Sequence, residues 1–111
     1  MLIHDLHPWD VSPAEARAIQ ADLAPRIVLE DGVALGAIRT VAGIDNGYEK
    51  TGDGGAVGRA AVVVLSVPDL EVIETATASV PVAFPYVPGL LSFREAPAVL
   101  AACAKVASEP D

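Results

Sequence analysis

Basic residues are scarce in this chain. Its 111 residues include seven Lys and Arg against 15 Asp and Glu, which gives a formal net charge of −8. Nonspecific affinity for nucleic acid comes mainly from Lys and Arg side chains that neutralise phosphates. The composition therefore argues against a surface that coats a phosphate backbone, unless divalent cations or another segment of the protein supply the missing positive charge.

Cysteine and long apolar runs are also lacking. Cys103 is the one cysteine, which excludes an intramolecular disulfide and is typical of a reducing compartment, so we expect a cytoplasmic protein. No stretch is long and apolar enough to span a bilayer, and Met1–Asp10 carries charged residues where a targeting signal has an apolar core. With 52% hydrophobic residues the chain can still bury a small core, and its length predicts a single domain over residues 1–111.

The first predicted element is a helix from Pro13 to about Ala24. Ser12 is a favourable N-cap, Pro13 suits the first helical position, and Glu15 has the spacing of a capping box with Ser12. Pro25 disfavours helical geometry in the residue before it, so we expect the helix to end there.

Two strands are predicted next, on either side of a glycine-rich stretch. The apolar runs 41–48 and 59–65 flank residues 52–58, which contain no phosphate-binding fingerprint and are expected to form a loop. The two strands are therefore expected to form a hairpin.

A third strand is predicted over residues 70–84. Apolar residues alternate along it, although Glu74 interrupts the alternation, and Pro81 places this end of the strand at a sheet edge or a bulge. A turn at residues 66–69 precedes the strand, with Pro68 suited to its second position.

The last predicted element is a helix that begins near Phe93 or Pro97 and ends near Ala107. One apolar stripe marks its buried face: Val99, Leu100, Cys103 and Val106. The order of helix, three-stranded antiparallel meander and helix predicts an α/β fold, and we expect a further strand to follow because the helix has to bury its stripe against a sheet.

Asp45 is a candidate metal ligand with a competing explanation. A carboxylate at the end of an apolar strand is unfavourable unless water, a hydrogen bond or a metal ion meets it. However, Asn46–Gly47 is a strong hairpin signal, so Asp45 could simply open a turn. The residue pattern leaves both interpretations open.

Glu95 is ambiguous in the same way. Ser92 and Glu95 have the spacing of a capping box, which would explain the glutamate without a metal ion. Pro97 weakens this explanation, because it would then fall beyond the first helical turn and remove a hydrogen bond. A helix start nearer Ala96 would leave Glu95 free at the helix mouth. Arg94, beside it, could pair with Glu95, orient its carboxylate or contact phosphate.

Before Glu95 lies a segment whose shape is largely preset. Pro85 and Pro88 fix their own φ angles and push the residues before them towards extended geometry, so Tyr86 and Val87 are expected to form a stiff loop. A stiff loop with an aromatic tip is suited to wedge into a partner.

Three segments resemble successive motifs of the endonuclease V family, in the family's order. They are Val41–Asp45 with Tyr48, then Gly58–Leu65, and finally Pro85–Glu95. The resemblance extends over nearly the whole chain and is most specific in the last segment, which has the pattern Pro-Tyr-x-Pro-Gly-x-Leu-Ser-Phe-Arg-Glu. It implies a ribonuclease H-like fold and a nuclease that acts on nucleic acid containing deoxyinosine or inosine.

The resemblance also implies roles for individual residues. Asp45 and Glu95 would be catalytic metal ligands for Mg²⁺, or alternatively Mn²⁺, and Tyr86 would be the tip of a strand-separating wedge. Gly89 and Leu91 would line the pocket for the flipped hypoxanthine base, and a mispaired base costs less to extrude than a paired one. Four further residues would contact the nucleic acid: Pro85, Val87, Pro88 and Arg94.

The implied activity is hydrolysis of a phosphodiester bond on the 3′ side of the deaminated nucleotide, in DNA repair. Two departures from the family matter: Asn46–Gly47 stands where an apolar residue and serine are more common, and the later metal-binding aspartate is absent from these residues. We therefore expect the chain to be the N-terminal portion of the nuclease domain and inactive alone. The alternatives are a noncatalytic inosine-binding module and a plain α+β structural domain.

Overall fold

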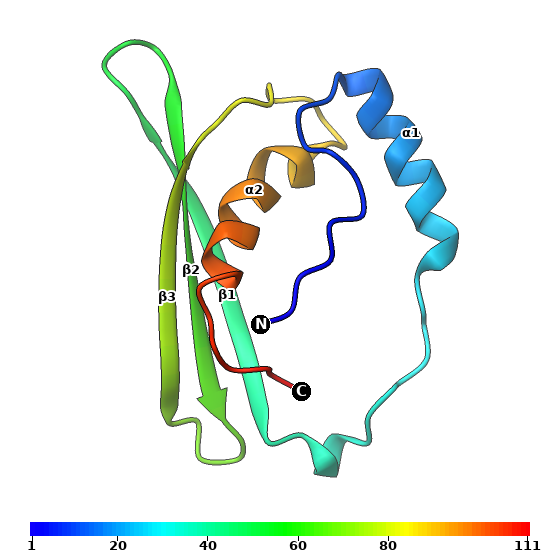
Figure 1. The fold of residues 1–111 in the computed structure, drawn as a ribbon, viewed down its shortest axis with the longest axis vertical. Helices are drawn as coiled ribbons and strands as arrows, with labels where there is room; N and C mark the ends of the chain where they lie inside the picture. Colours follow the sequence, from blue (N-terminus) through cyan, green and yellow to red (C-terminus); the bar gives the residue numbers. More distant parts are fainter.

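The computed structural model describes all residues from 1 to 111 and contains one sheet, two α-helices and two short 3-10 helices (Figure 1). Helix α2 lies across the sheet, while α1 stands apart and is joined to the first strand by a long connection. The elements are α1 (Pro13–Leu23), η1 (Ala24–Arg26), η2 (Leu35–Ala37), β1 (Thr40–Lys50), β2 (Ala56–Ser66), β3 (Val72–Pro81) and α2 (Leu91–Cys103).

Helix α1 begins as its sequence predicts. Ser12 is the N-cap, and the capping box with Glu15 is complete: the Glu15 amide donates to the Ser12 hydroxyl at 3.3 Å, and the Ser12 amide donates to the Glu15 carboxylate at 2.8 Å. The hydrogen bonds that the Ser12 amide and then the Ser12 hydroxyl donate to the Glu15 carboxylate lower the pKa of Glu15. Neither α-helix is long and apolar enough to cross a membrane.

The three strands form the predicted antiparallel meander, in the order β1-β2-β3. Of the two interpretations of Asp45, the one that places a turn at Asn46–Gly47 is wrong. Strand β1 continues to Lys50 because both residues pair with β2, Asn46 with Ala60 and Gly47 with Arg59, and the chain reverses only at residues 51–55.

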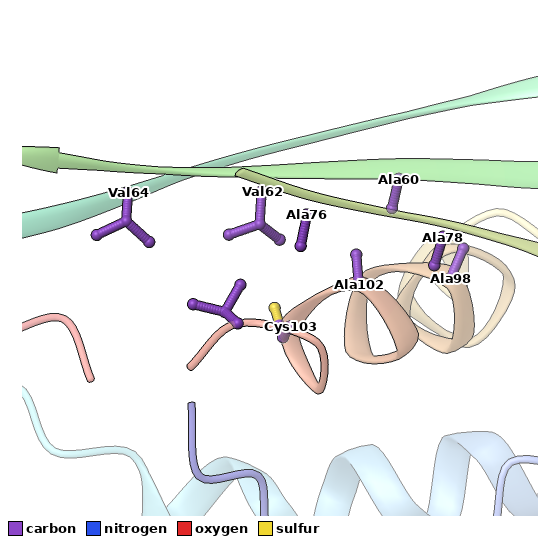
Figure 2. Packing of buried hydrophobic residues seen from close by; sticks show 9 residues of the cluster. Ala60, Val62, Val64, Ala76, Ala78, Ala98, Ala102 and Cys103 are labelled. Atoms are coloured by element: carbon purple, nitrogen blue, oxygen red, sulfur yellow. The ribbon is translucent and has the colours of Figure 1, made fainter. Parts of the chain in front are cut away.

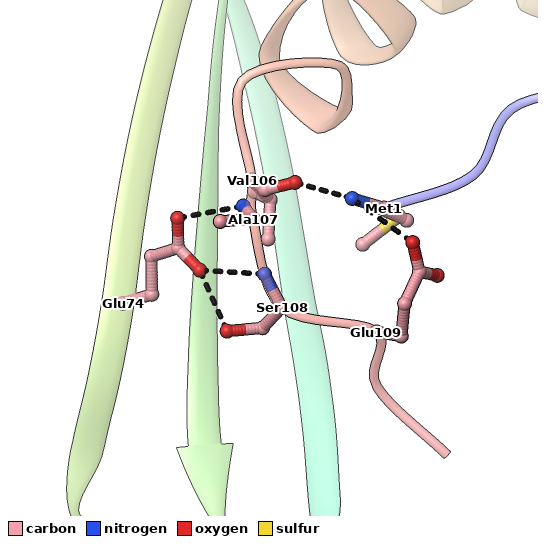
Figure 3. Close-up of polar contacts among 6 residues, drawn as sticks. All are labelled: Met1, Glu74, Val106, Ala107, Ser108 and Glu109. Carbon is pink, nitrogen blue, oxygen red and sulfur yellow. Dashed lines mark hydrogen bonds and ion pairs between the residues drawn. The ribbon is translucent and has the colours of Figure 1, made fainter.

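Strand β3 is shorter than predicted and ends at Pro81, on the sheet edge where a proline is tolerated. A register shift follows the pair Val64–Glu74, after which Leu65 pairs with Val72, so Ile73 is an extra residue. Glu74 faces the α2 side, and its carboxylate accepts hydrogen bonds from the amides of Ala107 and Ser108 at 2.8 and 2.9 Å (Figure 3). The interruption of the apolar alternation is therefore explained by the hydrogen bonds that Glu74 accepts from the segment after α2.

Helix α2 starts earlier than either predicted position and ends earlier than predicted. Its N-cap is Leu90, which provides no side-chain hydrogen bond, so the predicted capping box of Ser92 and Glu95 is wrong. A start near Ala96 is also wrong, because Glu95 lies inside the helix. Pro97 is accommodated within the helix.

The main core lies between the sheet and α2 (Figure 2). Small side chains let the helix approach closely, and a Cβ atom on Gly58 would lie only 3.4 Å from that of Ala98. Of the predicted stripe, Cys103 and Val106 are buried, whereas Val99 and Leu100 are only partly buried. The buried cluster comprises Ala60, Val62, Val64, Ala76, Ala78, Ala98, Ala102, Cys103 and Val106.

A second, smaller cluster joins α1 to α2. Ala16 of α1 packs with Phe84, Leu90 and Phe93, and Trp9 covers the cluster from the N-terminal arm. The Trp9 and Phe93 ring centroids are 5.7 Å apart, and those of Phe84 and Phe93 are 5.6 Å apart. This cluster anchors both ends of the segment between β3 and α2.

Candidate functional site

The segment of residues 85–90, here called the recognition loop, has an inner and an outer side. Leu90 is fully buried and Val87 packs against the second cluster, whereas the Tyr86 side chain is 73% exposed. The Leu90 amide donates to the Val87 carbonyl at 3.0 Å, and Gly89 has a φ angle of +84°, a conformation that side chains disfavour. The buried residues therefore hold the loop while Tyr86 projects from it.

Two side chains from other elements secure the recognition loop. From α1, the Gln20 amide nitrogen donates to the Gly89 carbonyl at 2.9 Å. From α2, Arg94 Nη1 donates to the Phe84 carbonyl, just before the loop, at 3.1 Å. Leu91, the first residue of α2, is 48% exposed and follows directly on the loop. The loop therefore starts and ends at fixed points.

Arg94 also contacts strand β1. Its guanidinium carbon lies 4.9 Å from the centroid of the Tyr48 ring, an arrangement typical of a cation–π interaction. Of the interpretations of Arg94, the ion pair with Glu95 does not form in this structure; the Arg94 Nη1 group donates to the Phe84 carbonyl. Arg94 thus connects β1, the recognition loop and α2.

Glu95 lies in the second turn of α2 and is partly buried. It forms no ion pair. Its negative charge affects Tyr48 on β1. The pKa of Tyr48 is raised, first by desolvation and then by the charge of Glu95. Glu95 is therefore a partly buried carboxylate close to Tyr48 of β1.

Asp45 lies on the other face of the sheet. It pairs with Ala61, and its neighbour Ile44 pairs with Val62, which is fully buried beneath α2. Because successive side chains alternate across a strand, Asp45 points away from α2. One of its oxygens accepts a hydrogen bond from the Asn46 amide at 2.9 Å, and the side chain is exposed.

The structure therefore does not bring Asp45 and Glu95 into contact. Asp45 belongs to β1, an edge strand, and points to the face of the sheet away from α2. Glu95 lies close to β1 on the α2 side of the sheet. No group of three or more His, Cys, Asp or Glu residues gathers in the chain. The two carboxylates fit a hard cation by chemistry, since Mg²⁺ prefers oxygen ligands and retains several waters.

The sequence does not predict the contacts of three residues of the site, Gln20, Tyr48 and Asn46. Gln20 is 69 residues away from its partner Gly89, and no local pattern signals such a bond. Tyr48 belongs to a recognised motif, but its stacking with Arg94 is visible only in the fold. Asn46 carries a buried amide nitrogen without a hydrogen-bond partner, on the same face as Tyr48.

Comparisons with known proteins agree with the motifs. The family model of endonuclease V matches residues 21–111. Endonuclease V of Nostoc sp. is 50% identical over 111 residues, which are 100% of this chain and 48% of the relative. The chain thus spans about half the length of the relatives that it matches.

Solved structures match the fold. The crystal structure of endonuclease V from Bacillus subtilis matches with a TM-score of 0.90 at 33% identity. The match covers 100% of this chain and 47% of the Bacillus subtilis chain. The crystal structure of Ciona intestinalis endonuclease V is a complex with a DNA containing an inosine followed by a ribo-adenosine. It matches with a TM-score of 0.68 at 30% identity, and the match covers 82% of this chain and 38% of the Ciona intestinalis chain. The predicted ribonuclease H-like fold class is confirmed, and the chain belongs to the endonuclease V family.

Proposed function

We propose that this chain is the N-terminal portion of a metal-dependent endonuclease that hydrolyses a phosphodiester bond on the 3′ side of deoxyinosine or inosine. The observation that carries the proposal is the recognition loop: an exposed Tyr86 on a loop held from α1 and α2, directly before the helix that bears Glu95. Family membership supports the same activity, and the complex of the Ciona intestinalis relative contains inosine in its DNA.

Recognition would begin with Tyr86. Its exposed ring can stack on bases, and inserting it between strands would favour extrusion of a weakly paired base. Gly89 and Leu91 would then face the extruded hypoxanthine, with Pro85, Val87 and Pro88 keeping the loop in shape. The stiffness of the loop means that little conformational entropy is lost when it binds.

The motifs imply that Asp45 and Glu95 would supply oxygen ligands for the metal ion, Mg²⁺ or Mn²⁺, although in this structure the two carboxylates lie on opposite sides of β1 and are not in contact. When bound, such an ion activates a water molecule and stabilises the leaving oxygen of a phosphodiester. Within the chain, Arg94 and Tyr48 fix the turn of α2 that carries Glu95, so the carboxylate is positioned by the same contacts that hold the recognition loop. Residues 1–111 would act as a single structural domain within the longer nuclease.

The test is cleavage by the full-length protein that carries this chain. With Mg²⁺ present, an oligonucleotide containing deoxyinosine or inosine should be cut on its 3′ side, while the same oligonucleotide with adenosine should remain intact. Equal cleavage of both substrates, or cleavage of neither, would overturn the proposed function. Omitting the metal ion, with EDTA added, is the control for metal dependence.

A second candidate function is a noncatalytic module that binds inosine-containing nucleic acid. It is favoured by the contacts that residues 1–111 make to the recognition loop, through Gln20, Arg94 and the loop's own backbone bond. The isolated chain of 111 residues would then bind the inosine oligonucleotide without cutting it. Robust metal-dependent cleavage by the isolated chain would refute this candidate.

A further inference from the structure

A groove runs beside the recognition loop, between the loop and the turn that joins β1 to β2. Its walls include Tyr48, Lys50, Gly55, Ala83, Tyr86 and Arg94, and we call it the hairpin groove. Its volume of about 730 Å³ is in the range of ligand-binding clefts. Tyr86, the exposed aromatic tip, stands on its wall, so whatever occupies the groove lies next to the wedge.

The hairpin groove contains two cationic side chains in a strongly acidic chain. Lys50 and Arg94 both line it, and neither takes part in the ion pairs of the structure. By contrast, Arg26 and Arg59 are neutralised by carboxylates. With a formal net charge of −8, two cations without acidic partners in one groove mark it as a place for an anion.

Arg94 is already oriented for such a ligand. One nitrogen donates to the Phe84 carbonyl and the guanidinium stacks on Tyr48, so two contacts fix the position of the guanidinium. A fixed guanidinium loses little entropy when it binds a phosphate, which its planar fork matches. Lys50 adds an exposed ammonium group from the end of β1.

The carboxylate of the β1–β2 turn, Asp53, is bonded within the turn and does not pair with Lys50 or Arg94. Asp53 accepts hydrogen bonds from the Thr51 hydroxyl and the Gly55 amide, at 2.5 and 3.0 Å, so it is directed into the turn itself. These bonds, the one from Thr51 first, lower the pKa of Asp53. The turn is thereby held in one shape as a wall of the groove.

We propose that the hairpin groove seats the phosphodiester backbone of the nucleic-acid strand beside Tyr86, with a phosphate between Lys50 and Arg94. The inference rests on the proposed function, because it assumes that the ligand is nucleic acid. It assigns the β1–β2 turn, which sequence reasoning treated as a plain loop, to substrate binding. Contacts to phosphate are independent of base identity, so the groove contributes affinity, whereas Tyr86 and the base pocket contribute the preference for inosine.

The test exploits the two lysines of the chain. Full-length Lys50→Ala and the matched control Lys105→Ala lose the same charge, but Lys105 lies at the far end of α2 and donates to the Thr77 carbonyl. Binding of labelled inosine and plain oligonucleotides is measured by fluorescence anisotropy at several salt concentrations, with Ca²⁺ in place of Mg²⁺. Thermal unfolding of both variants checks that each is folded.

Lys50→Ala should weaken binding of both oligonucleotides several-fold and by equal factors, and should lower the slope of log K against log salt by about 0.7 to 0.9. Lys105→Ala should change neither. If Lys50→Ala and Lys105→Ala give the same affinity and slope while the wild type still prefers inosine, the hairpin groove is refuted and the proposed function stands. If the wild type shows no preference for inosine, the proposed function fails instead.

Discussion

The two ends of the sheet differ in how their polar side chains are bonded. At the end where β3 begins, polar side chains form hydrogen bonds with other residues of the chain. At the opposite end, beside the recognition loop, several polar side chains have no partner, and we call this the recognition end. At the first end, Glu74 accepts hydrogen bonds from the amides of Ala107 and Ser108 (Figure 3). Asp111 accepts hydrogen bonds from the amides of Arg39 and Thr40, both at 2.9 Å. We call this the anchoring end. The terminal amino group of Met1 also bonds there, to the Val106 carbonyl and to Glu109.

At the recognition end, the polar groups with free capacity are Glu95, Lys50 and the amide of Asn46, and Tyr86 is exposed. Leaving a buried polar group such as the Asn46 amide unpaired costs stability unless a ligand or water satisfies it. The contrast therefore separates a part of the molecule that maintains the fold from a part that is available for function. Substitutions of the same chemical kind at the two ends should have opposite consequences.

The largest effect is expected for Glu95→Gln. In the full-length protein this change should lower inosine-dependent cleavage by about 10² to 10³, the scale of losing one electrostatic contact to developing charge. Thermal unfolding should change little, because Glu95 forms no ion pair in the structure. The matched control is Glu74→Gln at the anchoring end, which should retain cleavage. If both variants cleave equally well, Glu95 has no catalytic role.

Tyr86→Ala should have the next largest effect. Base stacking on an aromatic side chain is worth roughly 1 to 3 kcal/mol, so affinity for the inosine oligonucleotide should fall by about 5- to 150-fold. The side chain is 73% exposed, and the stability of the fold should be unaffected. Tyr86→Phe keeps the ring and should retain binding. Equal losses for both variants would show that the hydroxyl, rather than stacking, carries the interaction.

The recognition loop and the local elements were predictable because their signals lie close together in the sequence. The capping box of Ser12 and Glu15 and the meander were identified correctly from neighbouring residues. Helix α2 was misjudged because its start has no side-chain cap; burial of Leu90 and Phe93 in the second cluster fixes it instead. The sequence contains no local signal for such packing.

Long-range contacts account for the other differences. Asn46–Gly47 has the composition of a turn, but pairing with Ala60 and Arg59 overrides that preference. Glu74 interrupts the apolar alternation of its strand, and its carboxylate accepts hydrogen bonds from amides 33 and 34 residues later in the chain. The placement of Asp45 and Glu95 on different sides of β1 depends on strand register and on the position of α2, which spacing alone does not determine.

Glu74→Gln should destabilise the fold at neutral pH. The carboxylate accepts from two backbone amides and from the Ser108 hydroxyl, and a glutamine would turn its NH₂ group towards one of these donors. A lower melting temperature in calorimetry, with unchanged preference for inosine, is the expected result. An unchanged melting temperature would show that the bonds of the anchoring end do not hold the C-terminal segment in place.

The pH dependence of stability gives a further test of the anchoring end. Hydrogen bonds from Ser108 and Ala107 lower the pKa of Glu74 from 4.5 to about 2, so the folded state favours the charged form. This contribution is fully present above the unfolded pKa and is lost as the pH falls from about 4.5 to about 2. Denaturant unfolding of the wild type should therefore lose more stability over that range than Glu74→Gln does. Parallel curves for the two proteins would contradict the assignment.

The smallest effect is expected for Gln20→Ala, which removes the bond from α1 to the Gly89 carbonyl. An intramolecular hydrogen bond contributes roughly 0.5 to 1.5 kcal/mol, so the preference for inosine over adenosine should fall by about 2- to 10-fold. Gln20→Glu should have the same effect, since a carboxylate cannot donate to the carbonyl. Arg17→Ala, on the same helix and without a partner in the loop, should leave the preference unchanged. A preference that survives both Gln20 variants would mean that Arg94 and the buried Leu90 are sufficient to fix the recognition loop, and that only α2 couples it to Glu95.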